Sequence, residues 1–197
     1  GRGARGRGRG AMNRQQLAHL LRAACAVTGD PEVLVIGSQS ILGTFDEDML
    51  PPEATASAEA DLAFLDDPDR SKADQVEAVI GELSRFHQEN AVYAEGIQVE
   101  TAVLPTGWRD RLVGWDLRSS EPARPAFLEP HDLAVAKLAA GRPKDSAFVA
   151  ALVRKGLSHV APRLRVLKLK NKDFSRFQTF PAPAYTAVRD DTMHLHL

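Results

Sequence analysis

Cysteine is nearly absent from this sequence, because Cys25 is the one cysteine among 197 residues. A single thiol excludes an internal disulfide and a zinc site built from cysteine ligands. Cys25 lies on the apolar face of a segment whose spacing predicts a helix, so we expect a buried structural thiol. The scarcity of cysteine also favours a reducing compartment.

Long apolar runs are missing as well. No stretch approaches the ~18 apolar residues that a membrane helix needs, and no basic segment precedes an apolar one as in a signal peptide. We therefore expect no membrane contact and a cytoplasmic location. With 44% apolar residues, the chain can bury a substantial core, as one large domain or as a domain with an appended helical lobe.

Basic side chains are missing between Gly43 and Arg70, where every charged residue is acidic. The stretch 154–176 is the reverse, since Asp173 is its one acid. The acidic region suits cations and the basic one suits phosphates, although a basic helix face can also serve only solubility. The candidate RNA-binding residues in the basic stretch are Arg163, Arg165, Lys168 and Lys170.

The segment 1–11 begins with "GRGARGRGRG" and offers no apolar side chain to a core. We expect it to be a disordered Gly/Arg tail. Such a tail can act as a flexible tether for nucleic acid, or it can simply precede the first folded element.

The apolar periodicity predicts a mixed α+β chain. Strands are expected where short apolar or alternating runs occur, and helices where apolar residues recur at helical spacing. The expected strands are 32–37, 59–65 and 97–105, and the expected helices are 13–28, 38–45, 71–90, 106–117, 129–141, 143–156 and 161–174. The prolines in 46–57 should interrupt regular structure.

The character of the chain changes near residue 128. Residues 12–128 mix strands and helices, whereas 129–197 form a basic, helical lobe that ends in an irregular tail. We therefore expect two parts, a core at 12–128 and a lobe at 129–197.

The residues that indicate chemistry lie on the first two expected strands. Side chains alternate across a strand, so Glu59 and Asp61 share one face with about 7 Å between their Cα atoms. Two such carboxylates can bind hard cations, or can merely mark the solvated face of an edge strand. The first strand ends in Gly37 and Ser38, where a missing Cβ lets a phosphate approach the N–H groups and hydroxyls, including that of Ser40. Together they indicate a nucleotide and its metal ions.

An apolar strand, a Gly-Ser turn and an acidic-x-acidic strand resemble the nucleotidyltransferase superfamily, which shares a minimal fold with DNA polymerase beta. The usual motif has two aspartates and a shorter gap between its halves. Here the first acid is Glu59, and "TFDEDMLPPEATA" lengthens the gap.

The segments "GIQVETAVLPTGWRDRLV" and "FLEPHDLAVAKLAAGRPKDSAFVAALV" are similar to those of the bacterial AbiEii-like toxins, and the nearest in size is the MenT group of mycobacterial toxins. The similarity runs from residue 33 to about 156. It implies a polymerase-beta-like core with Gly37 and Ser38 contacting phosphate, Glu59 and Asp61 binding two Mg²⁺ ions, Lys137 contacting the triphosphate and Asp145 organising the catalytic site.

The implied activity is metal-dependent transfer of NMP from NTP to the 3′ end of tRNA. That transfer would block translation until a cognate antitoxin protein intervenes. The residues alone leave alternatives open, since Lys137 could be a solvated lysine near a helix C-terminus and Asp145 could merely stabilise a first turn.

Five further residues could contribute to a site. Glu100 could be a third metal carboxylate or a surface residue, because it falls on the expected strand 97–105. His194 and His196 lie in the terminal segment, where a ligand role is disfavoured. The spacing of Trp108 and Trp115 favours core packing over base stacking.

Two other functions remain open at this point. The chain could be a catalytically weak relative that works as an interaction module, because Glu59 replaces the usual aspartate. It could also transfer nucleotides to a small-molecule or protein hydroxyl.

Overall fold

The computed structural model describes residues 11–158. Several predictions lie outside the described residues. They are residues 1–10 of the Gly/Arg tail expected at 1–11, the helix at 161–174, the four candidate RNA-binding residues, and His194 and His196.

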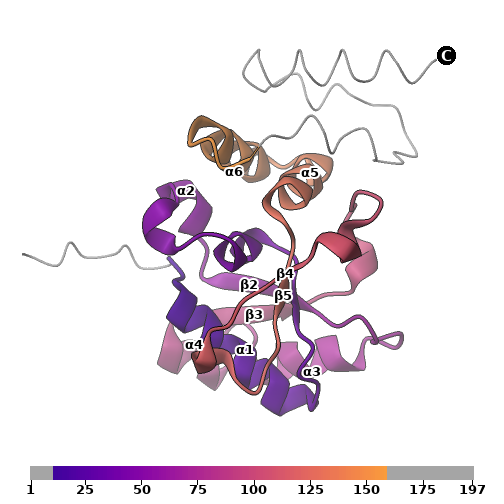
Figure 1. Cartoon of the computed structure of the whole chain (residues 1–197). Coiled ribbons are helices and arrows are strands. Elements are labelled where there is room, and N and C mark those ends of the chain that lie inside the picture. The colour runs from indigo at the N-terminus through magenta and orange to yellow at the C-terminus, as the bar shows by residue number, and fades with distance from the viewer. Residues whose placement is uncertain (1–10, 159–197) are drawn as a thin grey trace, which may run out of the picture.

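A five-stranded mixed sheet forms the centre of the molecule, with the strand order β3-β2-β1-β5-β4 (Figure 1). β1 pairs antiparallel with β2 and parallel with β5, while β2 pairs parallel with β3 and β4 pairs antiparallel with β5. The strands are β1 (Leu34–Val35), β2 (Glu59–Ala63), β3 (Tyr93–Gly96), β4 (Val113–Gly114) and β5 (Ala126–Phe127). The sheet and its helices confirm the predicted mixed α+β fold, consistent with a nucleotidyltransferase-like core.

The strands expected from the sequence agree with the structure in the first half of the chain and disagree with it afterwards. The strands expected at 32–37 and 59–65 are present but shorter. The strand expected at 97–105 is wrong, because the strand ends at Gly96 and residues Val99–Thr101 form a 3₁₀ helix. Ile97, Val99 and Ala102 pack against the core, so their side chains are buried although the backbone beyond the hydrogen bond from the Ile97 N–H to the Leu62 carbonyl oxygen does not continue the strand.

α1 (Arg14–Thr28) begins and ends where its capping residues predict. The Asn13 side chain accepts a hydrogen bond from the Gln16 N–H, and the Gln16 side chain accepts one from the Asn13 N–H. Gly29 closes the helix in the left-handed conformation with φ 70°. Cys25 is buried on this helix, as predicted.

The helix expected at 71–90 is broken into α3 (Ser71–Ile80) and α4 (Arg85–Asn90). Gly81 adopts an extended conformation, and a Cβ there would lie 2.2 Å from the Glu77 carbonyl oxygen. α3 packs against α1 and β3, and Figure 1 shows α1, α3 and α4 together on one side of the sheet.

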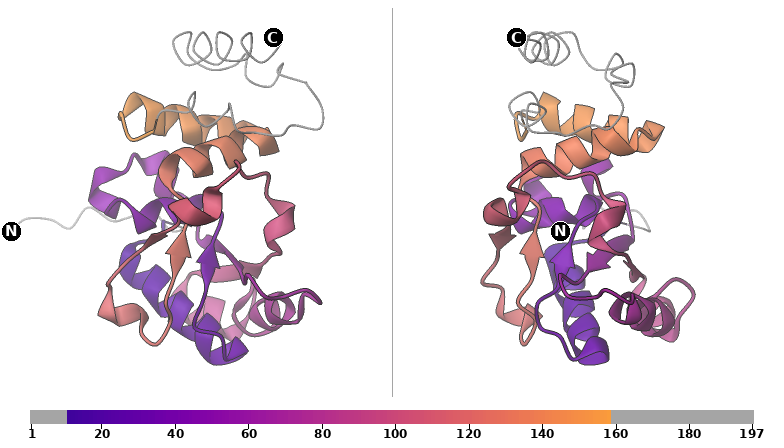
Figure 2. Two further views of the ribbon diagram at one scale, coloured as in Figure 1. Left: turned by 45° about the vertical axis from the view of Figure 1, so that its right-hand side comes forward. Right: turned by 90° about the vertical axis from the view of Figure 1, so that its right-hand side faces the viewer.

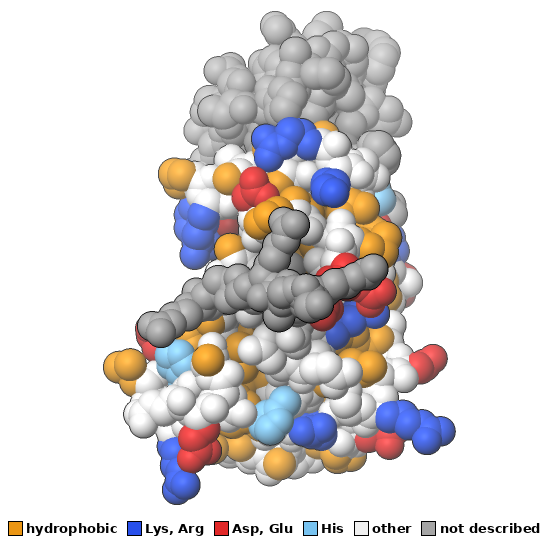
Figure 3. Space-filling view, turned by 90° about the vertical axis from the view of Figure 1, so that its left-hand side faces the viewer, with side chains coloured by type: hydrophobic (Ala, Val, Ile, Leu, Met, Phe, Trp, Pro, Cys, Tyr) orange, Lys and Arg blue, Asp and Glu red, His pale blue; other side chains and the backbone are white. Residues whose placement is uncertain are grey.

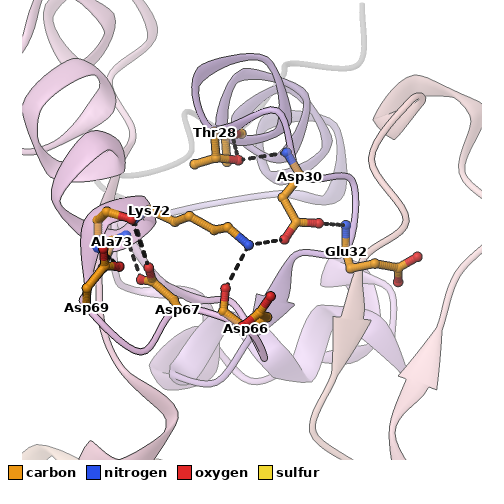
Figure 4. A network of polar contacts seen from close by, with 10 residues as sticks. Thr28, Asp30, Glu32, Asp66, Asp67, Asp69, Lys72 and Ala73 are labelled. Carbon is orange, nitrogen blue, oxygen red and sulfur yellow. Dashed lines mark hydrogen bonds and ion pairs between the residues drawn. The ribbon is translucent and has the colours of Figure 1, made fainter.

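A polar network fixes the connection from β2 to α3 (Figure 4). The Asp67 carboxylate accepts hydrogen bonds from the N–H groups of Lys72 at 2.9 Å and Ala73 at 3.0 Å, so it caps α3. The Lys72 ammonium lies 2.7 Å from Asp30 Oδ2 and donates to the Asp66 carbonyl oxygen. These contacts tie the loop after β2 to the segment that follows α1.

Shorter elements fill the remaining connections. The expected helix at 38–45 is a 3₁₀ helix at Ser38–Gly43. The proline-rich segment 46–57, expected to be irregular, contains a 3₁₀ helix at Glu47–Met49 and the short α2 (Pro52–Thr55), which Pro52 opens at a position that needs no N–H.

The helix expected at 106–117 is also wrong. A 3₁₀ helix covers Trp108–Arg111, and β4 follows it. Trp108 and Trp115 both pack against the core, and the Trp115 ring lies 4.6 Å from that of Phe127. A further 3₁₀ turn, Arg118–Ser120, leads towards β5.

The last two described helices are α5 (Pro130–Ala140) and α6 (Pro143–Arg154), close to the expected bounds. They lie side by side at one end of the molecule in both views of Figure 2. Buried side chains on both sides of residue 128, such as Phe127, Leu133 and Phe148, belong to one hydrophobic core. Among the described residues, no helix has the length and apolar character that crossing a membrane requires.

Candidate active site

Three carboxylates gather on one face of β2 and β3. Glu59 and Asp61 point the same way from β2, as the alternation of a strand predicts. In the parallel pairing of the two strands, Asp61 lies opposite Glu95 of β3. One oxygen from each of Glu59, Asp61 and Glu95 lies within 4.8 Å of the others.

The electrostatics of this cluster favour a bound cation. Burial raises the pKa of Asp61, and the neighbouring Glu59 charge raises it further. The pKa of Glu95 is also raised, by burial and then by the charges of Glu59 and Asp61. Carboxylate oxygens that repel one another are the hard ligands that Mg²⁺ takes, so this donor set fits such an ion.

Gly37 leaves the space that the Asp61 side chain occupies. A Cβ at Gly37 would lie 1.6 Å from Asp61 Oδ2 and 2.5 Å from Asp61 Cγ. The Ile36 N–H donates to the Asp61 carbonyl oxygen at 3.1 Å, which aligns the two strands at this point. The glycine predicted to admit a phosphate therefore makes room for the side chain of Asp61, a candidate metal ligand.

The two serines after Gly37 have different surroundings. Ser38 lines a cleft beside the carboxylates. Ser40 is fully buried, where its hydroxyl donates to the Val35 carbonyl oxygen at 2.9 Å and accepts from the Leu128 N–H at 2.6 Å. Ser40 thus joins β1 to the chain that enters α5, which corrects its expected role as a nucleotide ligand.

Lys137 and Asp145 form a buried pair beside the carboxylates. Lys137 Nζ lies 3.3 Å from Asp145 Oδ1, and the two residues are 8% and 1% exposed. The Lys137 ammonium also lies 5.5 Å from the centre of the Phe148 ring. The open alternative for Lys137, an ordinary solvated lysine, is therefore wrong.

Arg142 is a second cation on Asp145, with its Nε 2.7 Å from Asp145 Oδ2. Burial acts to raise the pKa of Asp145, but the hydrogen bond from Arg142 and the charge of Lys137 outweigh it, so the pKa is lowered. Burial lowers the pKa of Lys137, against the opposing charges of Asp145 and Asp61. Asp145 also accepts from the Arg142 N–H at 3.3 Å, so it stabilises the first turn of α6 and holds both cations.

Two clefts meet at these residues, and both are lined by Asp61, Glu95, Lys137 and Arg142. The wide cleft has a volume of about 630 Å³ and the narrow cleft about 330 Å³. Apolar side chains dominate the remaining wall of the wide cleft, including Ile97, Val103, Leu133, Ala136 and Ala140. Polar and charged side chains dominate the narrow cleft, including Ser38, Ser57, Glu59, Lys144 and Asp145.

Glu100 does not join the carboxylate cluster. It is exposed on the 3₁₀ helix after β3 and lines a separate cleft with Asp66 and Asp67. Glu95 takes the position that Glu100 was expected to take, because the strand lies earlier in the chain.

Sequence reasoning missed Glu95, Arg142 and Lys144. A usable signal for Glu95 was its place in the first apolar-alternating segment after the helix that follows β2, since a strand, a helix and a second strand commonly form a parallel pair. The spacing of three residues between Arg142 and Asp145 was a local signal for their ion pair, whereas the place of Arg142 in both clefts depends on the packing of α5 against α6.

A family model described as "Nucleotidyltransferase of unknown function (DUF6036)" matches residues 15–159. That range contains the three carboxylates, both clefts, and Lys137, Arg142 and Asp145. No curated protein matches the sequence, and no solved structure matches it.

Proposed function

This chain belongs to the DUF6036 family of nucleotidyltransferases, and from that membership we propose that it transfers NMP from NTP to an acceptor hydroxyl in a Mg²⁺-dependent reaction. The observation that carries the proposal is the cluster of Glu59, Asp61 and Glu95 next to the buried Lys137. Acidic ligands for a metal and a cation for phosphate are the groups that such a transfer needs.

Glu59, Asp61 and Glu95 would hold the metal, with two ions as the expected number. Bound Mg²⁺ supplies stabilisation of the negative charge that develops on the attacking and leaving oxygens. The carboxylates stay on the rigid ladder of β2 and β3, so their positions are set by strand register rather than by a mobile loop.

The triphosphate is best placed in the narrow cleft. Lys137, Arg142 and Lys144 line this cleft and can neutralise phosphate oxygens. Ser38, at the start of a 3₁₀ helix, also lines this cleft and adds polar groups. On the face drawn in Figure 3, Lys and Arg side chains lie at the upper end of the described surface, where α6 is placed, and also along the lower edge.

The acceptor is best placed in the wide cleft. In-line transfer needs the attacking hydroxyl and the leaving pyrophosphate on opposite sides of the phosphorus. Clefts that meet at Asp61 and Glu95 offer that arrangement. The apolar wall formed by Leu133, Ala136 and Ala140 suits the flat face of a nucleobase next to the reacting hydroxyl.

We further propose that the acceptor is the 3′ end of a tRNA in the cytoplasm, and that the protein is a toxin restrained by a cognate antitoxin. The support is the similarity of "DLAVAKLAAGRPKD" and its flanks to the AbiEii-like toxins, including the MenT group. The basic stretch 154–176 supplies candidate phosphate contacts. Arg154 and Lys155 are the basic residues of this stretch that the structure describes.

A labelling experiment tests the proposal. The protein is incubated with each α-³²P-labelled NTP, Mg²⁺ and total tRNA, and the label is traced to RNA or protein. We expect label in RNA, strong loss of label with Glu95→Gln, and little change with Glu100→Gln, a matched control outside the cluster. Label in protein would overturn the tRNA assignment, and equal loss in both variants would overturn the carboxylate assignment.

A further inference from the structure

The Tyr93 side chain contacts Glu59, one of the three carboxylates, on the side away from the two clefts. It lies on β3 directly opposite Glu59 of β2, and its hydroxyl donates to Glu59 Oε2 at 3.0 Å. Glu59 lines the narrow cleft, whereas Tyr93 lines neither the narrow nor the wide cleft. The phenol therefore reaches the carboxylate from the side that a substrate does not occupy.

Tyr93 is itself fixed by its neighbours. Its ring packs on the His87 ring of α4, with 4.6 Å between the ring centres. His87 Nδ1 accepts a hydrogen bond from the Leu83 N–H at 3.0 Å, which fixes the orientation of the imidazole. The Tyr93 N–H donates to the Ala58 carbonyl oxygen at 3.0 Å. The hydroxyl donor is thus positioned by packing and by the backbone pairing of β3.

A glutamate at this position needs such support more than an aspartate does. Its extra methylene adds a rotatable bond, and the nearby charges of Asp61 and Glu95 repel its carboxylate. A donor on one oxygen opposes rotation towards solvent and leaves the other oxygen for a cation. Hydrogen-bond partners of metal ligands act in this way, and their loss typically weakens metal binding by about 10–100-fold.

We propose that Tyr93 is a positioning residue that holds Glu59 for metal binding, and that this contact lets a glutamate serve where the nucleotidyltransferase motif usually has an aspartate. The inference rests on the proposed function only in taking Glu59 as a metal ligand.

Tyr93→Phe tests the inference, because it removes the hydroxyl and keeps the ring on His87. Mn²⁺ affinity is measured by electron paramagnetic resonance on protein without NTP, together with thermal unfolding without metal. We expect Mn²⁺ binding to weaken about 10-fold, with little change in the melting temperature of the metal-free protein. Unchanged Mn²⁺ affinity in Tyr93→Phe would overturn the inference and leave the proposed function standing.

The Glu59→Asp background provides the matched control. The aspartate carboxylate is one methylene too short to reach the Tyr93 hydroxyl. In this background, Tyr93→Phe should therefore change Mn²⁺ affinity less than about two-fold, which is the scatter expected for two substitutions that do not interact. An equal loss in both backgrounds would show that Tyr93 acts only through the fold and would overturn the inference. A parent protein that binds no Mn²⁺ would overturn the proposed function and this inference together.

Discussion

Replacement of Gly37 by alanine should displace the Asp61 carboxylate, a proposed metal ligand, without adding or removing a charge. The new Cβ would lie 1.6 Å from Asp61 Oδ2, 2.5 Å from Cγ and 2.9 Å from Cβ. Rotation about the last side-chain bond of Asp61 moves only the oxygens, so it cannot relieve the contact with Cγ. The side chain must turn at χ1, and the two strands must also separate slightly because this rotation leaves Asp61 Cβ in place; both movements carry the carboxylate out of the cluster.

The size of the effect follows from that movement. Inserting a methyl group into a packed site typically costs about 1–3 kcal/mol of stability. For a chain of this size, each kcal/mol corresponds to a melting-temperature drop of about 2–4 °C. Displacing a catalytic group by about 1 Å can reduce the rate about 100-fold, and we expect at least that loss here. Activity should therefore fall far more than the population of folded protein.

The assay combines NTP labelling, Mn²⁺ binding and thermal unfolding. Gly114→Ala is the matched control, because its Cβ would lie 3.9 Å from its nearest neighbour, the Pro125 carbonyl oxygen. This control should change stability by less than about 0.5 kcal/mol and leave Mn²⁺ binding intact. If Gly37→Ala kept parental labelling and Mn²⁺ affinity, the close packing of Asp61 against Gly37 would not govern the site.

Three further predictions concern charged groups. Asp145→Ala should lower the free energy of unfolding, measured in urea, by about 3 kcal/mol, because Lys137 loses its buried partner. Asp74→Ala, at an exposed ion pair, is the control and should lower the same free energy by less than about 1 kcal/mol. Burial acts to raise the pKa of Asp30, but the hydrogen bond and charge of Lys72 lower it overall. The Asp30–Lys72 pair therefore stabilises the fold above about pH 4, and this stabilisation is lost as the pH falls through the lowered pKa of Asp30. Lys72→Met should accordingly cost about 1 kcal/mol at pH 7, and its unfolding curve should approach that of the parent in acid; an equal difference at every pH would contradict this. A variant that neutralises the candidate RNA contacts carries Arg163→Gln, Arg165→Gln, Lys168→Gln and Lys170→Gln. It should flatten the slope of log tRNA affinity against log salt concentration by a few units and leave NTP binding unchanged. An unchanged slope would mean that these residues do not contact the RNA phosphates.

Local sequence signals predicted the features that depend on neighbouring residues in the chain. The alternation of β2 placed Glu59 and Asp61 on one face, and the capping residues Asn13 and Gly29 marked the ends of α1. Gly141 likewise marked the end of α5 with φ 68°. Each of these features involves groups only a few residues apart, so sequence spacing was sufficient.

The missed features depend on contacts between distant segments. Glu95 joins the cluster because β3 pairs with β2 in a register that places it beside Asp61. Ser40 was expected beside the nucleotide, but Leu128 hydrogen-bonds to its hydroxyl from far along the chain. Arg142 contacts Asp145 only three residues along the chain, but its place in both clefts depends on how α6 packs against α5. No periodicity within a single segment carries such information.

In the proposed function, a metal held by the carboxylate cluster supports nucleotidyl transfer, and Asp61→Ala removes one of its proposed ligands. The label that the parent and the variant transfer from NTP is measured with and without Mg²⁺, alongside the unfolding curve of each protein. We expect Mg²⁺-dependent labelling by the parent, no labelling by Asp61→Ala, and a folded variant, because the raised pKa of Asp61 means that its charged form is disfavoured in the folded protein. Near-parental labelling by folded Asp61→Ala, or labelling by the parent without any divalent ion, would contradict it.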